Sequence, residues 1–543
     1  MSSNSTQSFR IQVSPKAIEK ATKLFNATIE DTINELLQNS RRAGATRIDI
    51  DYNDTTCTIK DNGKGIFKDK CAIALGESGW EKDIVRQEDP AGMGIFSLAQ
   101  RGAIIMSAGL CVQLEPEHFC GKKDVIVHRG NITQGTSITF PLFRQEIRYF
   151  KNVVSDCVRY YPVNTYLNGQ QLERKNFLEE AVYEEYWHGL KIGIKKYWGF
   201  SREGINFHGH TINLQIAWVD EGNNRYWAAI DVVNAPELQL VLPTRKEVIQ
   251  NEFFNLLKDE CYRIIYRYIS TLESHDLAYK DFLHAASLGV QLPEAKKQLY
   301  KYEPERGNSE SSFKEENLED IVLSQAVVVS ALCDPSIAQI FYREFCKWQS
   351  NCKLYNAAYK YEGYSWYDSL PKLSNIALSI ESKGQRIDLD DALEIERCLD
   401  LSTSSSILVD RIWIEANLST NSGKKTIQVS TDLAVHNNPW HSIEEVKVFL
   451  TKNSDINVEE LTELLEAAYF TPSEDSDADS YYTQKEHFEE ESLEIATKVL
   501  LSPKLALEQR LKAVVEKYIR WIVPHNQKVA ITIDKTIKIT LLE

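Results

Sequence analysis

The first 142 residues of this 543-residue chain are predicted to form an α/β sandwich, in which helices cover a sheet. Two observations predict this fold. Apolar residues recur at helical spacing between Leu24 and Leu37, and the segments 47–52 and 56–61 then alternate apolar with polar residues. Glycine-rich stretches follow, with another helix expected near 93–102 and further strands after it.

The first helix is expected to begin at Ser14-Pro15, because serine is a good N-cap and proline is favoured at the first helical position. Gly44 ends the helical pattern. The turn residues Asn53-Asp54 then separate the two alternating segments, which therefore read as a hairpin.

Three more parts are expected after residue 142. Residues 143–275 are rich in strand patterns, with hairpin turns at Asn168-Gly169 and Gly222-Asn223 and a helix from about 252, as in an α/β transducer-like domain. Residues 276–400 look mostly helical. Residues 401–543 are expected to form a small α+β region with an acidic, mobile loop at 473–492 and a closing hairpin.

Composition limits the class of protein. The hydrophobic share of 43% and the charged share of 26% are those of a globular protein, and 15 Pro and 24 Gly exclude collagen-like classes. No apolar run is long enough to span a bilayer and the start lacks a secretory signal, so we expect a soluble, cytoplasmic protein without a membrane partner. The ten cysteines form no C-x-x-C pair, which argues against a zinc site or a disulfide scaffold.

The net charge of −16 is unevenly distributed. Residues 1–250 contain 30 of the 62 basic and 30 of the 78 acidic residues, so the whole excess of acid lies in residues 251–543. A neutral first half and an acidic second half make direct nucleic-acid binding less favoured, because such binding normally needs a basic surface. The two halves are expected to have different functions.

The segment ELLQNSRRAGAT at 35–46 is the first candidate site. Glu35 and Asn39 are four residues apart and share one helix face, where a carboxylate could activate water beside an amide oxygen that coordinates Mg²⁺. Taken alone, the pair is a weak signal and more often marks an ordinary exposed helix face.

Three glycine-containing segments follow. In DNGKGI, Asp61 ends a strand and could accept a hydrogen bond from an exocyclic amine, while Gly63 and Gly65 allow a tight turn; a plain hairpin turn is the alternative. In DPAGMGIFSLA, Gly92 and Gly94 precede a helix, whose amino end suits a phosphate chain. The polar stretch 77–88 before it resembles a lid, and QGTSITF places Gly135 and Thr136 at the start of a strand.

Together and in this order, the four segments resemble the nucleotide site of the GHKL superfamily, with its Bergerat-type ATPase fold. The superfamily includes type II topoisomerases, MutL proteins, heat-shock chaperones, MORC proteins and sensor histidine kinases, and the first segment is most similar to the MutL N-box. The resemblance implies ATP and Mg²⁺ as ligands. It implies that Glu35 activates water, that Asn39 holds Mg²⁺, that Asp61 reads adenine, and that the remaining ATP contacts come from Gly63, Gly65, Gly92, Met93, Gly94, Ile95 and Thr136.

One residue departs from the N-box pattern, and a further candidate for ATP hydrolysis lies outside the four segments. Arg42 stands where such N-boxes usually carry Asp, which puts a secondary water or ion contact in doubt. In several branches a second domain supplies a cation to the γ-phosphate, and Lys246, or else Arg245, occupies the matching place in LVLPTRKEVIQ. An ordinary basic helix start is the alternative.

The resemblance implies an ATP-hydrolysing clamp that dimerises on ATP and acts, like a chaperone or a prokaryotic defence-associated ATPase, on a protein client through the acidic half. Two other functions remain open at this point. One is a nucleotide-sensing module with little turnover, against which the intact Glu35 counts. The other is a DNA-remodelling ATPase of the topoisomerase, MutL or MORC type.

Overall fold

The computed structural model describes residues 28–66, 94–196, 204–241, 246–307, 317–331, 333–348, 351–389, 406–437, 442–473, 475, 478–525, 527–533 and 535–542. The chain divides into two compact units, Met1–Ala295 and Lys296–Glu543. Among the helices in the described ranges, none combines the length and the apolar composition needed to cross a membrane.

An eight-stranded sheet with the order β5-β4-β3-β6-β2-β1-β7-β8 begins the first unit. Its pairs are antiparallel except for β1 with β7, which run parallel. Helices α2 and α6 share one hydrophobic core with this sheet, through apolar side chains such as Leu36, Val154 and Ile138. The strands are β1 Arg47–Tyr52, β2 Thr56–Asp61, β3 Ala103–Ser107, β4 Leu110–Leu114, β5 Val127–Arg129, β6 Thr136–Pro141, β7 Asn164–Leu167 and β8 Gln170–Gln171, and the helices are α2 Ile29–Arg42, η2 Gly94–Leu98, α4 Pro116–Phe119, α5 Arg144–Ile147 and α6 Phe150–Val158.

The predicted α/β sandwich is confirmed here, and the alternating segments 47–52 and 56–61 are β1 and β2. Two boundaries differ from the prediction. The predicted helix does not run unbroken to Gly44, because Thr28 is an N-cap with extended backbone and α2 begins at Ile29; the predicted start at Ser14-Pro15 lies outside the described residues and stays a prediction. The sheet also continues beyond residue 142, because β7 pairs with β1.

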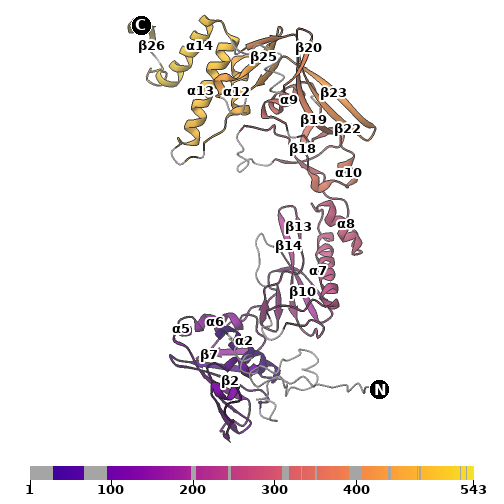
Figure 1. Ribbon diagram of the computed structural model, residues 1–543, viewed down its shortest axis with the longest axis vertical. Coiled ribbons are helices and arrows are strands. Elements are labelled where there is room, and N and C mark those ends of the chain that lie inside the picture. Colours follow the sequence, from indigo (N-terminus) through magenta and orange to yellow (C-terminus); the bar gives the residue numbers. More distant parts are fainter. Residues whose placement is uncertain are drawn as a thin grey trace, which may run out of the picture. The chain divides into compact units, whose positions relative to one another are not determined.

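A second sheet completes the first unit, with the order β12-β11-β14-β10-β9 and with β13 paired to β14. Helix α7 packs on this sheet, as Figure 1 shows beside β10, β13 and β14, and it begins at Glu252 as the sequence predicts. The elements are β9 Ala181–Trp187, β10 Leu190–Lys196, β11 Ile205–Phe207, β12 His210–Ile212, β13 Trp218–Glu221, β14 Asn224–Val232, α7 Glu252–Ser270 and α8 Tyr279–Ser287.

The second unit contains a six-stranded sheet, with the order β18-β17-β19-β22-β23 and with β20 paired to β19, and a three-stranded sheet, β21-β25-β24. One hydrophobic core includes side chains from both sheets and from α9 and α12. Its strands are β15 Gln298–Tyr300, β16 Leu318–Asp320, β17 Ala326–Val329, β18 Lys353–Asn356, β19 Lys372–Ser382, β20 Gln385–Asp388, β21 Ser406–Val409, β22 Arg411–Thr420, β23 Gly423–Thr431, β24 Leu433–His436, β25 Lys447–Thr451, β26 Lys528–Ile533 and β27 Ile537–Leu542. Its helices are α9 Pro335–Trp348, η3 Tyr359–Tyr361, α10 Ser365–Asp368, η4 Ile443–Glu445, α12 Val458–Tyr469, α13 Tyr481–Leu500, α14 Pro503–Val514 and η5 Val515–Ile519.

Two predictions for this unit were wrong. The described part of residues 276–400, most of which belongs to this unit, is not mostly helical: β15 to β20 lie there, and β17 is a fully buried strand paired on both sides. A short apolar run does not distinguish a buried strand from a buried helix. The predicted acidic loop 473–492 is helical from Tyr481, because Ser480 caps the helix and Lys485 pairs with Glu466 and Glu489.

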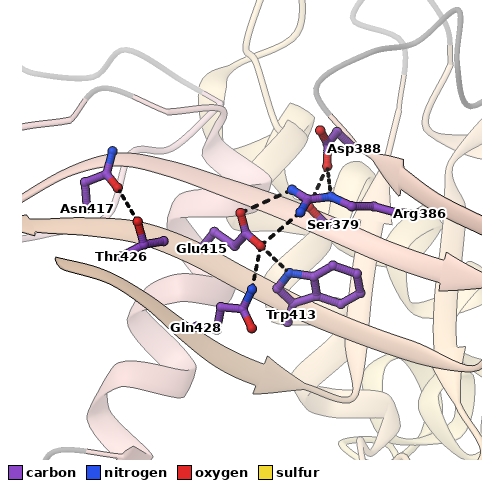
Figure 2. A network of polar contacts seen from close by, with 8 residues as sticks. All are labelled: Ser379, Arg386, Asp388, Trp413, Glu415, Asn417, Thr426 and Gln428. Carbon is purple, nitrogen blue, oxygen red and sulfur yellow. Dashed lines mark hydrogen bonds and ion pairs between the residues drawn. The ribbon is translucent and has the colours of Figure 1, made fainter.

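A polar network covers one face of the six-stranded sheet (Figure 2). The carboxylate of Glu415 accepts hydrogen bonds from the Arg386 guanidinium at 3.1 and 3.2 Å, from the Trp413 indole at 2.8 Å and from Gln428 at 2.7 Å. Ser379 donates to Asp388, which also accepts from Arg386. The network joins β19, β20, β22 and β23 through their side chains.

Candidate functional site

Helix α2 presents one polar face. Thr28 and Asp31 form a capping box that fixes the start of the helix, with Thr28 Oγ1 accepting from the Asp31 N–H at 3.1 Å. The spacing of four residues then places Asp31, Glu35 and Asn39 on the same side, and all three are half-buried. The opposite side packs into the core through Ile33, Leu36 and Leu37.

Gly94, the first residue of η2, lies directly against this face. A Cβ atom at Gly94 would be 2.4 Å from Asn39 Nδ2 and 2.9 Å from Glu35 Oε1. Only glycine allows the backbone to approach these two side chains so closely. The structure therefore joins the first and third sequence segments at Glu35 and Asn39.

Asp61, in the second sequence segment, has hydrogen-bond partners in the first, second and fourth segments. Its carboxylate accepts hydrogen bonds from the Gly63 N–H at 2.8 Å and from Ser40 Oγ at 3.3 Å. Burial raises the pKa of Asp61 above its ordinary value, and hydrogen bonds from Gly63, Ser40 and the Thr136 backbone oppose the rise. The carboxylate is an acceptor held beside the helix that carries Glu35 and Asn39.

Ser107, which the sequence analysis did not single out, supports the glycine turn. Its hydroxyl accepts from the Ile66 N–H at 2.9 Å and donates to the Gly135 carbonyl at 2.9 Å, and it lies 3.4 Å from the Thr136 hydroxyl. A Cβ atom at Gly65, where φ is +85°, would lie 2.7 Å from this hydroxyl. No sequence signal marks Ser107, since its place follows from the register of β3 with β6.

Arg42, the departure from the family pattern, is buried beside the same two residues. Its side chain is 1% exposed, and its Nη1 lies 3.3 Å from Asn39 Oδ1 and 3.7 Å from Glu35 Oε1. A permanent cation therefore contacts both the predicted base and the predicted metal ligand.

Lys246 comes from the loop between the second sheet and α7. Its Nζ is 3.1 Å from Asp31 Oδ1, one helical turn before Glu35. Ile95 is 9% exposed and packs into the core of the first sheet. Gly92, Met93 and Arg245 lie outside the described residues.

The residues present fit a nucleotide. The backbone at Gly63, Gly65 and Gly94 lies too close to neighbouring side chains to leave room for a Cβ atom. These neighbours are Asp61 at Gly63, Ser107 at Gly65, and Glu35 with Asn39 at Gly94. An amide oxygen together with phosphate oxygens is a usual ligand set for Mg²⁺, and Asn39 Oδ1 could supply the first. The guanidinium of Arg42, beside Asn39 and Glu35, would repel a metal ion at this position.

Comparison with known sequences agrees with this site. Residues 27–100 match the family model described as "Histidine kinase-, DNA gyrase B-, and HSP90-like ATPase". The DNA mismatch repair protein MutL of Klebsiella pneumoniae subsp. pneumoniae is 40% identical over 85 residues, and MutL of another strain gives the same values. The alignment covers 15% of this chain and only 13% of the length of these relatives.

Solved structures give a looser similarity. The ATPase region of Saccharomyces cerevisiae topoisomerase II has a TM-score of 0.30 and 15% identity, covering 40% of this chain and 77% of that chain. The N-terminal domain of a DNA repair protein has a TM-score of 0.31 and 13% identity, covering 45% and 94%.

Proposed function

We propose that the protein binds ATP against α2 and hydrolyses it, because residues 27–100 match the family model of histidine kinase-, DNA gyrase B- and HSP90-like ATPases. The observation that carries this proposal is the contact of Gly94 with both Glu35 and Asn39, which joins two motifs far apart in sequence. The carboxylate of Asp61, held by Ser40 and Gly63, supports it at the other end of the site.

In the proposed reaction Asp61 accepts a hydrogen bond from the adenine amine, and the backbone at Gly63, Gly65 and Gly94 lines the nucleotide. Glu35 accepts the proton of the attacking water. Asn39 Oδ1 would hold Mg²⁺, which, when bound, neutralises phosphate charge. Lys246, already on the Glu35 face of α2, would stabilise the negative charge that develops on the transferred phosphoryl group.

We further propose that ATP drives homodimerisation and that the protein works as an ATP-gated clamp on a protein client. The acidic excess of residues 251–543 supports a protein partner in preference to nucleic acid. The 40% identity to MutL over 85 residues favours, as a second candidate, an ATPase that acts on DNA.

The test is ATP turnover and molecular mass, measured for the wild type and for Glu35→Ala. Loss of the base should lower turnover by at least ~100-fold while ATP binding is retained, and ATP should hold the variant as a dimer. Glu30→Ala, on the exposed first turn of α2, is the matched control and should turn over ATP normally.

Two other outcomes would favour a different function. A wild type that binds ATP without hydrolysing it, with or without a partner, would make the protein a nucleotide sensor. Retention on DNA that weakens as salt is raised would favour the DNA-acting candidate.

A further inference from the structure

Arg42 is a buried cation placed within the proposed site. With 1% of its side chain exposed, it has lost almost all of its hydration, and a guanidinium so placed depends on fixed polar partners. Two of these are Asn39 Oδ1 at 3.3 Å and Glu35 Oε1 at 3.7 Å. The same two side chains are those proposed to hold Mg²⁺ and to activate water.

The contact fixes which way the Asn39 amide points. A guanidinium has donors only, so the amide atom that faces Arg42 is the oxygen. The amide nitrogen faces the opposite way, toward Gly94, where a Cβ atom would be 2.4 Å away. The oxygen proposed to coordinate Mg²⁺ is therefore the atom that Arg42 already engages.

We propose that Arg42 is a positioning residue that holds Asn39 Oδ1 and competes with Mg²⁺ for it, which makes ATP binding in this protein only weakly dependent on Mg²⁺. The inference rests on the proposed function. A guanidinium and a divalent cation repel each other across a few ångströms, so that Arg42 at Asn39 Oδ1 disfavours a metal ion bound to the same oxygen. The positive charge of Arg42 is present with or without the metal, because a guanidinium stays protonated.

The experiment measures the dissociation constant of ATP for the full chain by calorimetry, in EDTA and over a series of Mg²⁺ concentrations. Wild type should gain less than about threefold in affinity from Mg²⁺, whereas Arg42→Met should gain about tenfold or more, since each tenfold corresponds to about 1.4 kcal/mol. Arg42→Lys keeps the charge and should behave more like wild type. Arg41→Met is the matched control: Arg41 bonds to Gln38 instead, so its loss should leave the Mg²⁺ response unchanged.

The outcomes separate the two proposals. If wild type binds no ATP in either condition, the proposed function falls and this inference falls with it. If ATP binds and the Mg²⁺ response of Arg42→Met equals that of wild type, this inference alone is overturned. Thermal melting reports whether each variant folds, and Arg42→Gln, which keeps a donor group, replaces Arg42→Met if that variant does not fold.

Discussion

At the scale of single residues, Asp61 shows how a carboxylate with a proposed role in binding opposes stability. Burial raises its pKa, so the folded chain holds this proton more tightly than the unfolded chain does. Between the ordinary value of 3.8 and the raised one, the unfolded state binds fewer protons. The free energy of unfolding therefore falls as pH rises through this window, and the ionised carboxylate is a cost at neutral pH.

We expect Asp61→Asn to raise the free energy of unfolding at neutral pH by about 1 kcal/mol, because it removes a partly buried charge. The same change should weaken ATP binding by at least about tenfold, because an amide keeps only one of the two acceptor oxygens. Denaturant unfolding at several pH values and ATP titration check the two effects. A variant that is less stable and binds ATP normally would contradict both.

At the scale of elements, α2 is held at two points, by the loop that follows the second sheet and by a turn of that sheet. Lys246 pairs with Asp31 near its start, and near its end Gln38 Nε2 donates to the His208 carbonyl at 2.9 Å. His208 and Gly209 form the turn between β11 and β12, and both have positive φ. The helix that carries Glu35 and Asn39 is thus connected to the second sheet and its following loop at two points, one helical turn before Glu35 and between Glu35 and Asn39.

We expect Gln38→Leu to lower turnover by about tenfold while the ATP dissociation constant changes less than about threefold, because the contact positions the helix and not the nucleotide. Steady-state kinetics and equilibrium binding measure the two. Arg41→Met, which removes the hydrogen bond from Arg41 Nε to Gln38 Oε1, should leave both nearly unchanged. Equal losses in binding and turnover would argue against a positioning contact.

The polar network of Figure 2 stabilises the six-stranded sheet. The pKa of Glu415 is lowered, first by the hydrogen bond from the Trp413 indole and then by those from Arg386 and Gln428, with burial opposing. This stabilisation is present above the ordinary value of 4.5 and is lost as pH falls through the lowered one.

We expect Glu415→Gln to destabilise the second unit by about 1–2 kcal/mol at neutral pH, because Arg386 loses its charged partner. The difference from wild type should shrink as pH falls below the ordinary pKa of a glutamate. Denaturant unfolding at neutral and acidic pH measures this, with Glu463→Gln on the exposed side of α12 as the control. A difference that does not change with pH would contradict the assigned role.

At the scale of the whole molecule, the described hydrophobic clusters stay within the two units. The clusters that contain α2 and α7 lie within Met1–Ala295, and the large cluster around α9 and α12 lies within Lys296–Glu543. Each unit therefore has its own core, which is the usual condition for independent folding.

We expect residues 1–295 expressed alone to melt cooperatively and to bind ATP with a dissociation constant within about threefold of that of the full chain, because the described parts of the proposed site lie in this unit. Circular dichroism melting and ATP titration check this. A fragment that melts without a transition would show that the unit depends on the rest of the chain.

The sequence by itself predicted the strands β1 and β2, the start of α7 and the shared face of Glu35 and Asn39, because these depend on local periodicity. It failed for residues 276–400, where an apolar run fits a buried strand as well as a helix. Only the tertiary structure decided that Ser40 reaches Asp61, that Ser107 supports the glycine turn and that Arg42 is buried against Asn39. The first two contacts depend on strand register and on packing between segments that are distant in the sequence. The burial of Arg42 depends on the segments that pack against α2. Sequence spacing encodes neither of these.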